Sequence, residues 1–350
     1  MRAPGIAAAL LVVAAAALDL FGQDTRADPP AALPLPADTL DGRALLTVPG
    51  GLPREVPEPE DNRFSAARLA LGRRLFFDPL LSADRKVSCA TCHRPDHGFA
   101  SPERFPTGAH GRRGERSAPT LFNRAFGASQ MWDGRFATLE EQVLAPIEAE
   151  NEMALTVPEA LARLAAHPEY PALFGAAFAG REAGPPRADE LARALAAFVR
   201  RLFLGDSPVD RFREGRFSAL SPEERGGLWV FESKGGCWRC HAGDNFTDEE
   251  FHNTGVGASE GRAEPGREAV TGRDGDRGRF KTPTLRGLAF TAPYMHDGSL
   301  ATLEEVVEFY RNGGGPNPHL DPELVPLELS DREAELLVAF LRALSRTAPR

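Results

Sequence analysis

The amino-acid sequence predicts an all-α fold organised in two modules. Apolar residues recur at helical spacing in several segments, whereas alternating strand patterns are few. The 34 glycines and 30 prolines predict many turns between short helices. A five-residue pattern, Cys-x-x-Cys-His, occurs once in each half of the chain. We therefore expect one module at 61–206 and a second at 216–350.

The N-terminal segment is typical of an export signal. Arg2 precedes an Ala-rich apolar run from Ile6 to about Leu20, and a Pro-rich stretch follows. We expect a secretory signal peptide at 1–24, an extended lead-in at 25–60 and export to the periplasm. An uncleaved membrane anchor is the alternative, because the run approaches the roughly 20 residues of a spanning helix.

Helical patterns in the first module lead up to a chain break. The segments with helical spacing are 64–77, 139–147, 158–178 (with interruptions) and 189–204. Gly205, Asp206, Ser207 and Pro208 then end the pattern, so we expect the connection between the modules to run on to Gly215.

Two helix starts in the second module carry a capping signal. Ser221 is followed by Pro222 and, three positions after the serine, by Glu224, and the same Ser-to-Glu spacing recurs from Ser330 to Glu333. The first helix leads directly into the second Cys-x-x-Cys-His pattern. The second places apolar residues on one face: Leu336, Leu337, Phe340, Leu341 and Leu344.

Composition excludes some classes of function. Charged residues make up 26% and hydrophobic residues 42%, a globular profile rather than a disordered one. The net charge of −9 disfavours non-specific binding of nucleic acid, so no nucleic-acid partner is expected. An acidic surface permits steering of a basic protein partner, although a solvated surface is the simpler interpretation.

The four cysteines all lie in the repeated pattern, at Cys89, Cys92, Cys237 and Cys240. Two thiols at this spacing can each form a thioether to a haem vinyl group, and the following histidine, His93 or His241, then serves as proximal iron ligand. Paired zinc motifs normally lie about 15–20 residues apart, far closer than these, and a thioredoxin-like dithiol needs no histidine after each pair. The sequence therefore predicts two covalently bound haem c groups.

Four stretches, at 88–93, 118–135, 237–241 and 281–298, resemble the di-haem cytochrome c peroxidase and MauG family. The resemblance extends over nearly all of 61–346. It implies two cytochrome c-like domains, each with one haem c. In that family peroxide reacts at the N-terminal haem, and the C-terminal haem stores or relays electrons. A tryptophan lies between them, and Trp132 matches it, although a buried structural tryptophan is the simpler alternative.

The family also places three residues on the open face of the peroxide-reacting haem, and Gln142, Pro146 and Glu152 fall at matching spacings. Cleavage of an O–O bond needs a group that accepts a proton from one oxygen and returns it to the other. A carboxylate in a dry pocket can do so, and an amide can hold peroxide in line. Taken alone, Glu152 would be read as a solvated surface acid.

The sixth ligand of the second haem distinguishes the branches of the family. Cytochrome c peroxidases have Met twelve residues after the glycine of the H-D-G motif, and MauG-like members have Tyr. Here that position, counted from Gly298, is Tyr310. A phenolate ligand would stabilise oxidised iron. A core aromatic residue is the structural alternative for Tyr310, and Met295 is the rival ligand.

The resemblance further implies one calcium ion and a gating histidine. Thr291 and Pro293 match the family's carbonyl donors for calcium, but its asparagine is replaced by Ser117, whose hydroxyl is a weaker donor. His110 lies close to the position of a histidine that, in some family peroxidases, blocks the reactive iron until reduction. A solvent-exposed loop histidine is the alternative.

We therefore expect a peroxidase-type enzyme that uses hydrogen peroxide. Its electrons would come from a small redox protein, such as a cytochrome c or a cupredoxin, or from side chains of a protein substrate, as in the MauG-like branch that Tyr310 favours. A non-catalytic di-haem electron-transfer cytochrome is the rival, although a carrier has no use for the group formed by Gln142, Pro146 and Glu152. A haem-based sensor would need an output domain that these motifs do not provide.

Overall fold

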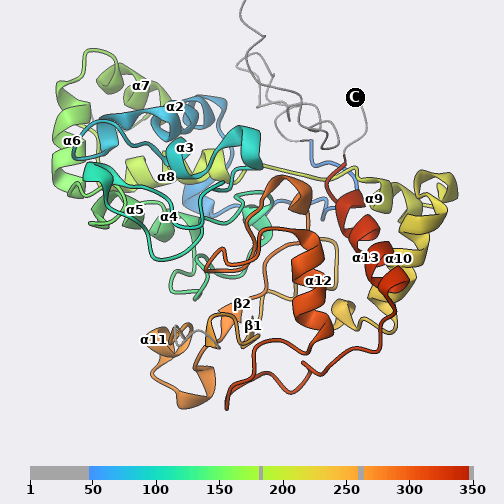
Figure 1. Ribbon diagram of the computed structural model, residues 1–350. Coiled ribbons are helices and arrows are strands. Elements are labelled where there is room, and N and C mark those ends of the chain that lie inside the picture. The colour runs from blue at the N-terminus through green and yellow to red at the C-terminus, as the bar shows by residue number, and fades with distance from the viewer. Residues whose placement is uncertain (1–46, 181–183, 259–263, 347–350) are drawn as a thin grey trace, which may run out of the picture. The chain divides into compact units, whose positions relative to one another are not determined.

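A computed structural model describes residues 47–180, 184–258 and 264–346 (Figure 1). The expected signal peptide and most of the lead-in lie outside the described residues. None of the helices in these ranges is both long and apolar enough to cross a membrane. The fold is mostly helical, as predicted, and the strands of the described residues are the short antiparallel pair β1 (Phe251–His252) and β2 (Phe280–Lys281).

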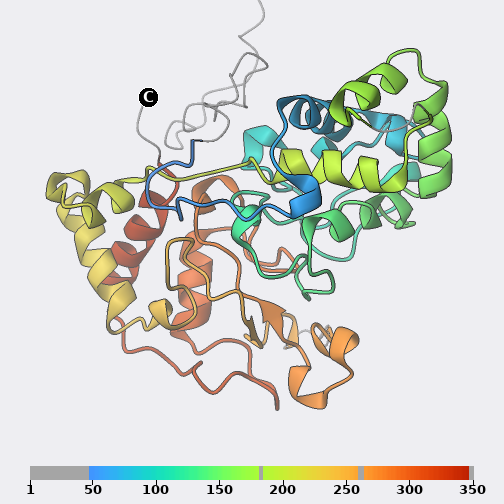
Figure 2. The ribbon, with the colours of Figure 1, turned by 180° about the vertical axis from the view of Figure 1, so that it is seen from behind.

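The first half of the chain forms seven of the described α-helices around one apolar core. Figures 1 and 2 show α2 running alongside α8. The core extends from Leu69 to Leu204. The helices are α2 (Ala66–Phe77), α3 (Cys89–Cys92), α4 (Leu139–Gln142), α5 (Ala145–Glu148), α6 (Val157–Ala166), α7 (Tyr170–Ala177) and α8 (Ala188–Val199).

The second half packs around a separate core, which extends from Val209 to Leu344. The long terminal helix α13 lies against α10, with α12 beside it (Figure 1). The expected domain bounds of 61–206 and 216–350 remain a prediction, and this second core begins slightly before 216. The helices are α9 (Pro208–Arg213), α10 (Pro222–Glu232), α11 (Glu268–Thr271), α12 (Leu303–Arg311) and α13 (Asp331–Ala343).

One glycine in each half allows the paired helices to approach closely. A Cβ atom on Gly72 of α2 would lie 1.8 Å from the carbonyl oxygen of Ala194 in α8. A Cβ atom on Gly227 of α10 would lie 1.9 Å from the carbonyl oxygen of Leu336 in α13. Both distances are impossible for real atoms, so the two helix pairs require glycine at these positions.

Three sequence-based expectations need correction. The helix expected over 139–147 is interrupted between α4 and α5, because Pro146 has no N–H for a bond within a continuous helix and instead occupies the first turn of α5. The helix expected over 189–204 ends at Val199. The expected connection contains α9, because Ser207 caps this helix by accepting a bond from the N–H of Asp210 at 3.2 Å.

One segment of the first half recurs in the second half, which we did not predict from the sequence. The backbone bridge Gln130–Phe136 recurs as Tyr294–Leu300, a shift of 164 positions. The residue after each bridge start, Met131 or Met295, has a positive φ of 71° or 74°. Each bridge is followed by a helix, α4 in the first half and α12 in the second, and the starts of these helices differ by the same shift. In an alignment with this shift, Pro146 corresponds to Tyr310.

The buried guanidinium of Arg286 joins three segments. Its two terminal nitrogens donate to both carboxylate oxygens of Asp210 at 2.8 and 2.7 Å. It also donates to the carbonyl oxygens of Gly51 and Asp244. The side chains of Arg286 and Asp210 are 0% and 2% exposed, so neither charge could be stabilised by water if its partner were lost.

We predict that Arg286→Ala lowers the free energy of unfolding by about 3–5 kcal/mol, because it leaves the buried carboxylate of Asp210 without a cation. Chemical denaturation of the haem-loaded protein measures this. Arg332→Ala is the matched control, since Arg332 is 63% exposed and pairs with Glu335 at the surface; its loss should cost less than about 0.5 kcal/mol. Equal effects of the two substitutions would contradict the prediction.

Candidate haem and peroxide sites

The first Cys-x-x-Cys-His pattern presents its histidine as a ligand. The Nδ1 atom of His93 lies 3.0 Å from the carbonyl oxygen of Phe99 and 3.1 Å from that of Pro119. Carbonyl oxygens only accept, so Nδ1 carries the proton and Nε2 is left with a lone pair for a metal ion. Burial lowers the pKa of His93, which keeps the imidazole in its neutral, metal-binding form.

The second pattern has the same arrangement. The Nδ1 atom of His241 lies 3.0 Å from the carbonyl oxygen of Phe246, and burial lowers the pKa of this histidine too. Phe99 and Phe246, which supply the carbonyls, have φ values of 53° and 51°, in the left-handed region that phenylalanine rarely adopts. Both rings are buried. The two halves therefore position their histidines by the same strained turn.

The four cysteines are placed for covalent attachment of one group in each half. No disulfide joins any of them. Burial raises the pKa of the thiols of Cys89, Cys92 and Cys237 to about 12, because apolar surroundings disfavour the thiolate. The spacing, the lack of disulfides among these cysteines and the oriented histidines together match what a covalently attached haem needs in each half.

A cavity of 380 Å³ brings the first motif together with the predicted catalytic residues. Its volume lies in the range of about 300–1,000 Å³ that is common for ligand sites. Residues far apart in the sequence meet here, which supports the proposed grouping. The cavity is lined by Cys89, Cys92 and His93 and by Trp132, Gln142, Pro146 and Glu152.

Glu152 is the acidic group of interest in this cavity. Burial raises its pKa above the ordinary value of 4.5, while the nearby Arg135 acts in the opposite direction. A carboxyl group with a raised pKa can exchange a proton more readily near neutral pH. Gln142 lies on the same cavity, and its Nε2 donates to the sulfur of Met131 at 3.5 Å. Pro146 contributes an apolar wall without a hydrogen-bond donor.

Trp132 connects the two halves of the chain. Its indole N–H donates to the carbonyl oxygen of Ser117 at 2.8 Å, and the N–H of Ser117 donates to the carbonyl oxygen of His296 at 2.8 Å. The rings of Trp132 and His296 meet edge to face, with centroids 6.4 Å apart. His296 was not expected at the site, although aligning the duplicated segments places it opposite Trp132.

Tyr310 lies in the last turn of α12, close to the second motif. Burial, with smaller contributions from the thiols of Cys240 and Cys237, raises the pKa of its hydroxyl. This places the phenol within electrostatic range of both attachment cysteines. Met295, the rival ligand, lies in the turn of the duplicated segment and is partly buried.

The remaining predicted residues are not brought together. His110 is exposed, it does not line the cavity, and its backbone N–H donates to Asp84 at 3.0 Å. The structure therefore gives no support to His110 as a blocking ligand. No hydrogen bond among the described residues joins Ser117 to Thr291 or Pro293. Between these last two, the carbonyl oxygen of Ala292 lies 2.5 Å from a ring nitrogen of His97.

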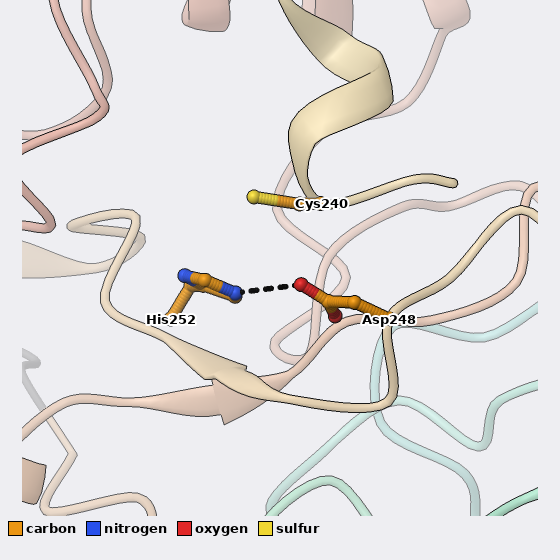
Figure 3. Close-up of side chains that lie close together, drawn as sticks. All are labelled: Cys240, Asp248 and His252. Atoms are coloured by element: carbon orange, nitrogen blue, oxygen red, sulfur yellow. Dashed lines mark hydrogen bonds and ion pairs between the residues drawn. The ribbon is translucent and has the colours of Figure 1, made fainter. Parts of the chain in front are cut away.

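A second group of ligand-type side chains lies beside the second motif. Figure 3 shows Cys240, Asp248 and His252, whose ligand atoms all lie within 4.8 Å of one another. The two ring nitrogens of His252 lie 2.7 Å from Asp321 and 3.0 Å from Asp248. Because Cys240 supplies a thioether sulfur to the expected haem, we interpret the group as surroundings of that attachment site rather than as a separate metal site.

Several known proteins resemble this chain over most of its length. Residues 66–218 match the family model of the di-haem cytochrome c peroxidases. The methylamine utilization protein MauG of Methylorubrum extorquens is 41% identical over 294 residues, which cover 83% of this chain and 82% of that protein. The cytochrome c551 peroxidase of Pseudomonas aeruginosa is 35% identical over 321 residues, which cover 90% and 88%.

Solved structures share the fold. A MauG-like protein associated with microbial copper homeostasis superposes with a TM-score of 0.76 at 31% identity, covering 84% of this chain and 94% of that one. The di-haem peroxidase BthA of Burkholderia thailandensis, at 23% identity and a TM-score of 0.72, shows the likeness of fold alone. The chain is an oxidoreductase of the peroxidase type, and it belongs to the di-haem cytochrome c peroxidase and MauG family.

Proposed function

We propose that hydrogen peroxide reacts in the cavity beside His93 and that oxidising equivalents pass through Trp132 to the second haem. One observation carries the proposal: the cavity that contains the first attachment motif also contains Glu152, a carboxyl group whose pKa is raised by burial. An electron carrier without catalysis would have no use for this acid, which is why we rank the non-catalytic cytochrome second.

In this proposal each half of the chain is a cytochrome c-like domain with one haem, at 61–206 and 216–350. Cys89, Cys92 and His93 hold the first haem, and the corresponding second group is Cys237, Cys240 and His241. When bound, each haem supplies an iron centre that can be oxidised by two-electron or one-electron steps. The polypeptide supplies orientation, dryness and proton transfer.

Glu152 and Gln142 perform the proton chemistry. Glu152 would take the proton from one peroxide oxygen and return it to the other, so that the O–O bond breaks and the second oxygen leaves as water. The haem held by Cys89, Cys92 and His93 would supply the two electrons that this cleavage needs. Gln142 can orient the peroxide, because its amide lies on the same cavity wall. Pro146 offers no competing hydrogen bond and keeps that side apolar.

Trp132 is suited to electron transfer without loss of a proton. Its N–H donates to the carbonyl oxygen of Ser117, and a carbonyl cannot accept the proton permanently when the indole gives up an electron. The electron can therefore return without waiting for reprotonation. The contact with His296 extends the path toward the second half.

The electron donor is a small redox protein, such as a cytochrome c or a cupredoxin, or the side chains of a protein substrate. Tyr310 favours the second option, because a tyrosine ligand on the second iron would stabilise its oxidised state. The likeness to a protein named MauG is greater than that to a named cytochrome peroxidase, which points the same way. We place the enzyme in the periplasm on the expected signal at 1–24.

The proposal also includes one calcium ion and a role of His110 in blocking the first haem. Ser117, Thr291 and Pro293 would supply oxygen donors for one calcium ion. Because Ser117 stands where the family has an asparagine side chain, the hydroxyl of Ser117 would be the donor at this position. His110 would act as a gate only after moving from its exposed position.

The overall proposal is tested by stopped-flow absorption with hydrogen peroxide. Rapid change in the Soret region of the fully oxidised protein, without added reductant, supports the branch that oxidises a protein substrate. Reaction only after one-electron reduction supports a cytochrome peroxidase gated by His110. Failure of both forms to react would establish the non-catalytic alternative.

We predict that Glu152→Gln slows the reaction with peroxide by about 10²–10⁴-fold, because the amide cannot accept the proton. The rate of the native protein should fall at low pH with a midpoint above 4.5, because burial raises the pKa of Glu152 and only the carboxylate is a base. This acid limb should vanish in the variant. Glu150→Gln is the matched control, since Glu150 is 90% exposed, and it should leave the rate unchanged.

Replacing both cysteines of one motif by alanine should remove one covalently attached haem and leave the other. The readout is the mass of the denatured protein purified from cells that mature c-type cytochromes. Cys89→Ala with Cys92→Ala tests the first site, and Cys237→Ala with Cys240→Ala tests the second. A native protein that carries no covalent haem, or only one, would overturn the two-haem assignment.

We predict that Tyr310→Phe changes the absorption and paramagnetic resonance spectra of the second haem, because the phenol oxygen is lost as a ligand. Met295→Leu is the matched control, and its spectra should equal those of the native protein. The opposite result, with only Met295→Leu changing the spectra, would assign the ligand to Met295.

A further inference from the structure

Two cations from different halves of the chain share one carboxylate. Arg124 donates to both oxygens of Glu249 at 2.9 and 3.3 Å. Lys281, on β2, reaches the same carboxylate at 3.3 Å and donates to the carbonyl oxygen of Ser129 at 2.6 Å. We call Arg124, Glu249 and Lys281 the boundary cluster.

The boundary cluster holds two basic side chains and one carboxylate, so it carries one excess positive charge when Lys281 is protonated. The side chains are nearly buried, at 7% exposure for Lys281 and 11% for both Arg124 and Glu249. Excess buried charge is costly unless a counter-ion is near. The pKa of Lys281 falls to about 7 through burial and the repulsion of Arg124, as expected for a cation without a full partner.

The two basic residues of the boundary cluster lie at the cavity of the first motif. Arg124 and Lys281 both line the cavity that contains Cys89, Cys92 and His93. Lys281 thus comes from the second half of the chain but contributes to the first haem site. Its backbone N–H also donates to the carbonyl oxygen of Trp132 at 2.8 Å, so the same residue fixes the proposed relay.

A haem brings two carboxylate groups, its propionates, into such a cavity. We infer that Lys281, together with Arg124, binds a propionate of the haem attached at Cys89 and Cys92, and so acts as a positioning residue that sets its reduction potential. The propionate supplies the negative charge that the boundary cluster lacks. A cation held there stabilises the electron added on reduction, so its charge raises the potential of the first haem.

This inference rests on haem attachment at the first motif. We expect Lys281→Met to lower the potential of the first haem, Lys281→Arg to restore most of the native value, and Glu249→Gln to raise it, because the last change removes a negative charge. Lys234→Met is the matched control, because Lys234 pairs with Glu333 at the surface and is 50% exposed; it should leave the potential unchanged.

Spectroelectrochemical titration of the two-haem protein gives the potentials, and paramagnetic resonance assigns them to the haem with or without a sixth ligand. Unchanged potentials in Lys281→Met with both haems attached, or shifts of the same sign in Lys281→Met and Glu249→Gln, would overturn the inference but leave the proposed function intact. If Lys281→Met does not fold, the sign of the Glu249→Gln shift decides alone. Absence of the first haem from the native protein would instead remove the proposed function itself.

Discussion

The orientation of two imidazoles by backbone carbonyls is the interaction on which the rest of this structure depends. A histidine can bind iron through Nε2 only if Nδ1 holds the proton, and the carbonyls of Phe99 and Phe246 impose that tautomer. Each carbonyl is aimed by a residue with positive φ, at a cost on the order of 1–3 kcal/mol. Burial of the phenylalanine rings offsets this cost: Phe99 packs against Phe76 and Phe122, and Phe246 packs against Phe231 and Phe340.

Local signals in the sequence were sufficient to predict most helices and to find the two Cys-x-x-Cys-His motifs. Ser221 and Ser330 specify where α10 and α13 begin. Each serine hydroxyl accepts a hydrogen bond from the backbone N–H three residues later, which has no partner within the helix. The same locality explains the errors. The sequence around Ser207 is compatible both with a break after one helix and with the cap of the next, and it caps α9. Pro146 can be accommodated in the first turn of a helix but not in its interior, and here it lies in the first turn of α5.

Contacts between distant residues could not be read in this way. Glu152 enters the cavity with His93 only because the chain folds back, and Lys281 reaches Arg124 across 157 positions of sequence. Neither of these contacts produces a periodic pattern that could be recognised in a single sequence. The duplicated segment was visible in principle, since Met131 to Gly134 and Met295 to Gly298 share their pattern, and it would have identified His296 as the counterpart of Trp132.

The duplication also shows where the two halves of the chain differ beside their Cys-x-x-Cys-His motifs. At the position of Pro146, which cannot offer a ligand atom, the second half has Tyr310, which can. Where the first half has the amide of Gln142, the second has Val306, which neither donates nor accepts. In the function proposed above, the first half therefore keeps groups that can hold and protonate a small oxygen compound, and the second half has Tyr310, the proposed iron ligand, and an apolar side chain in their place. Since the same kind of turn holds His93 and His241 in the two halves, we attribute the proposed division of labour between the halves to the substitutions at these two positions.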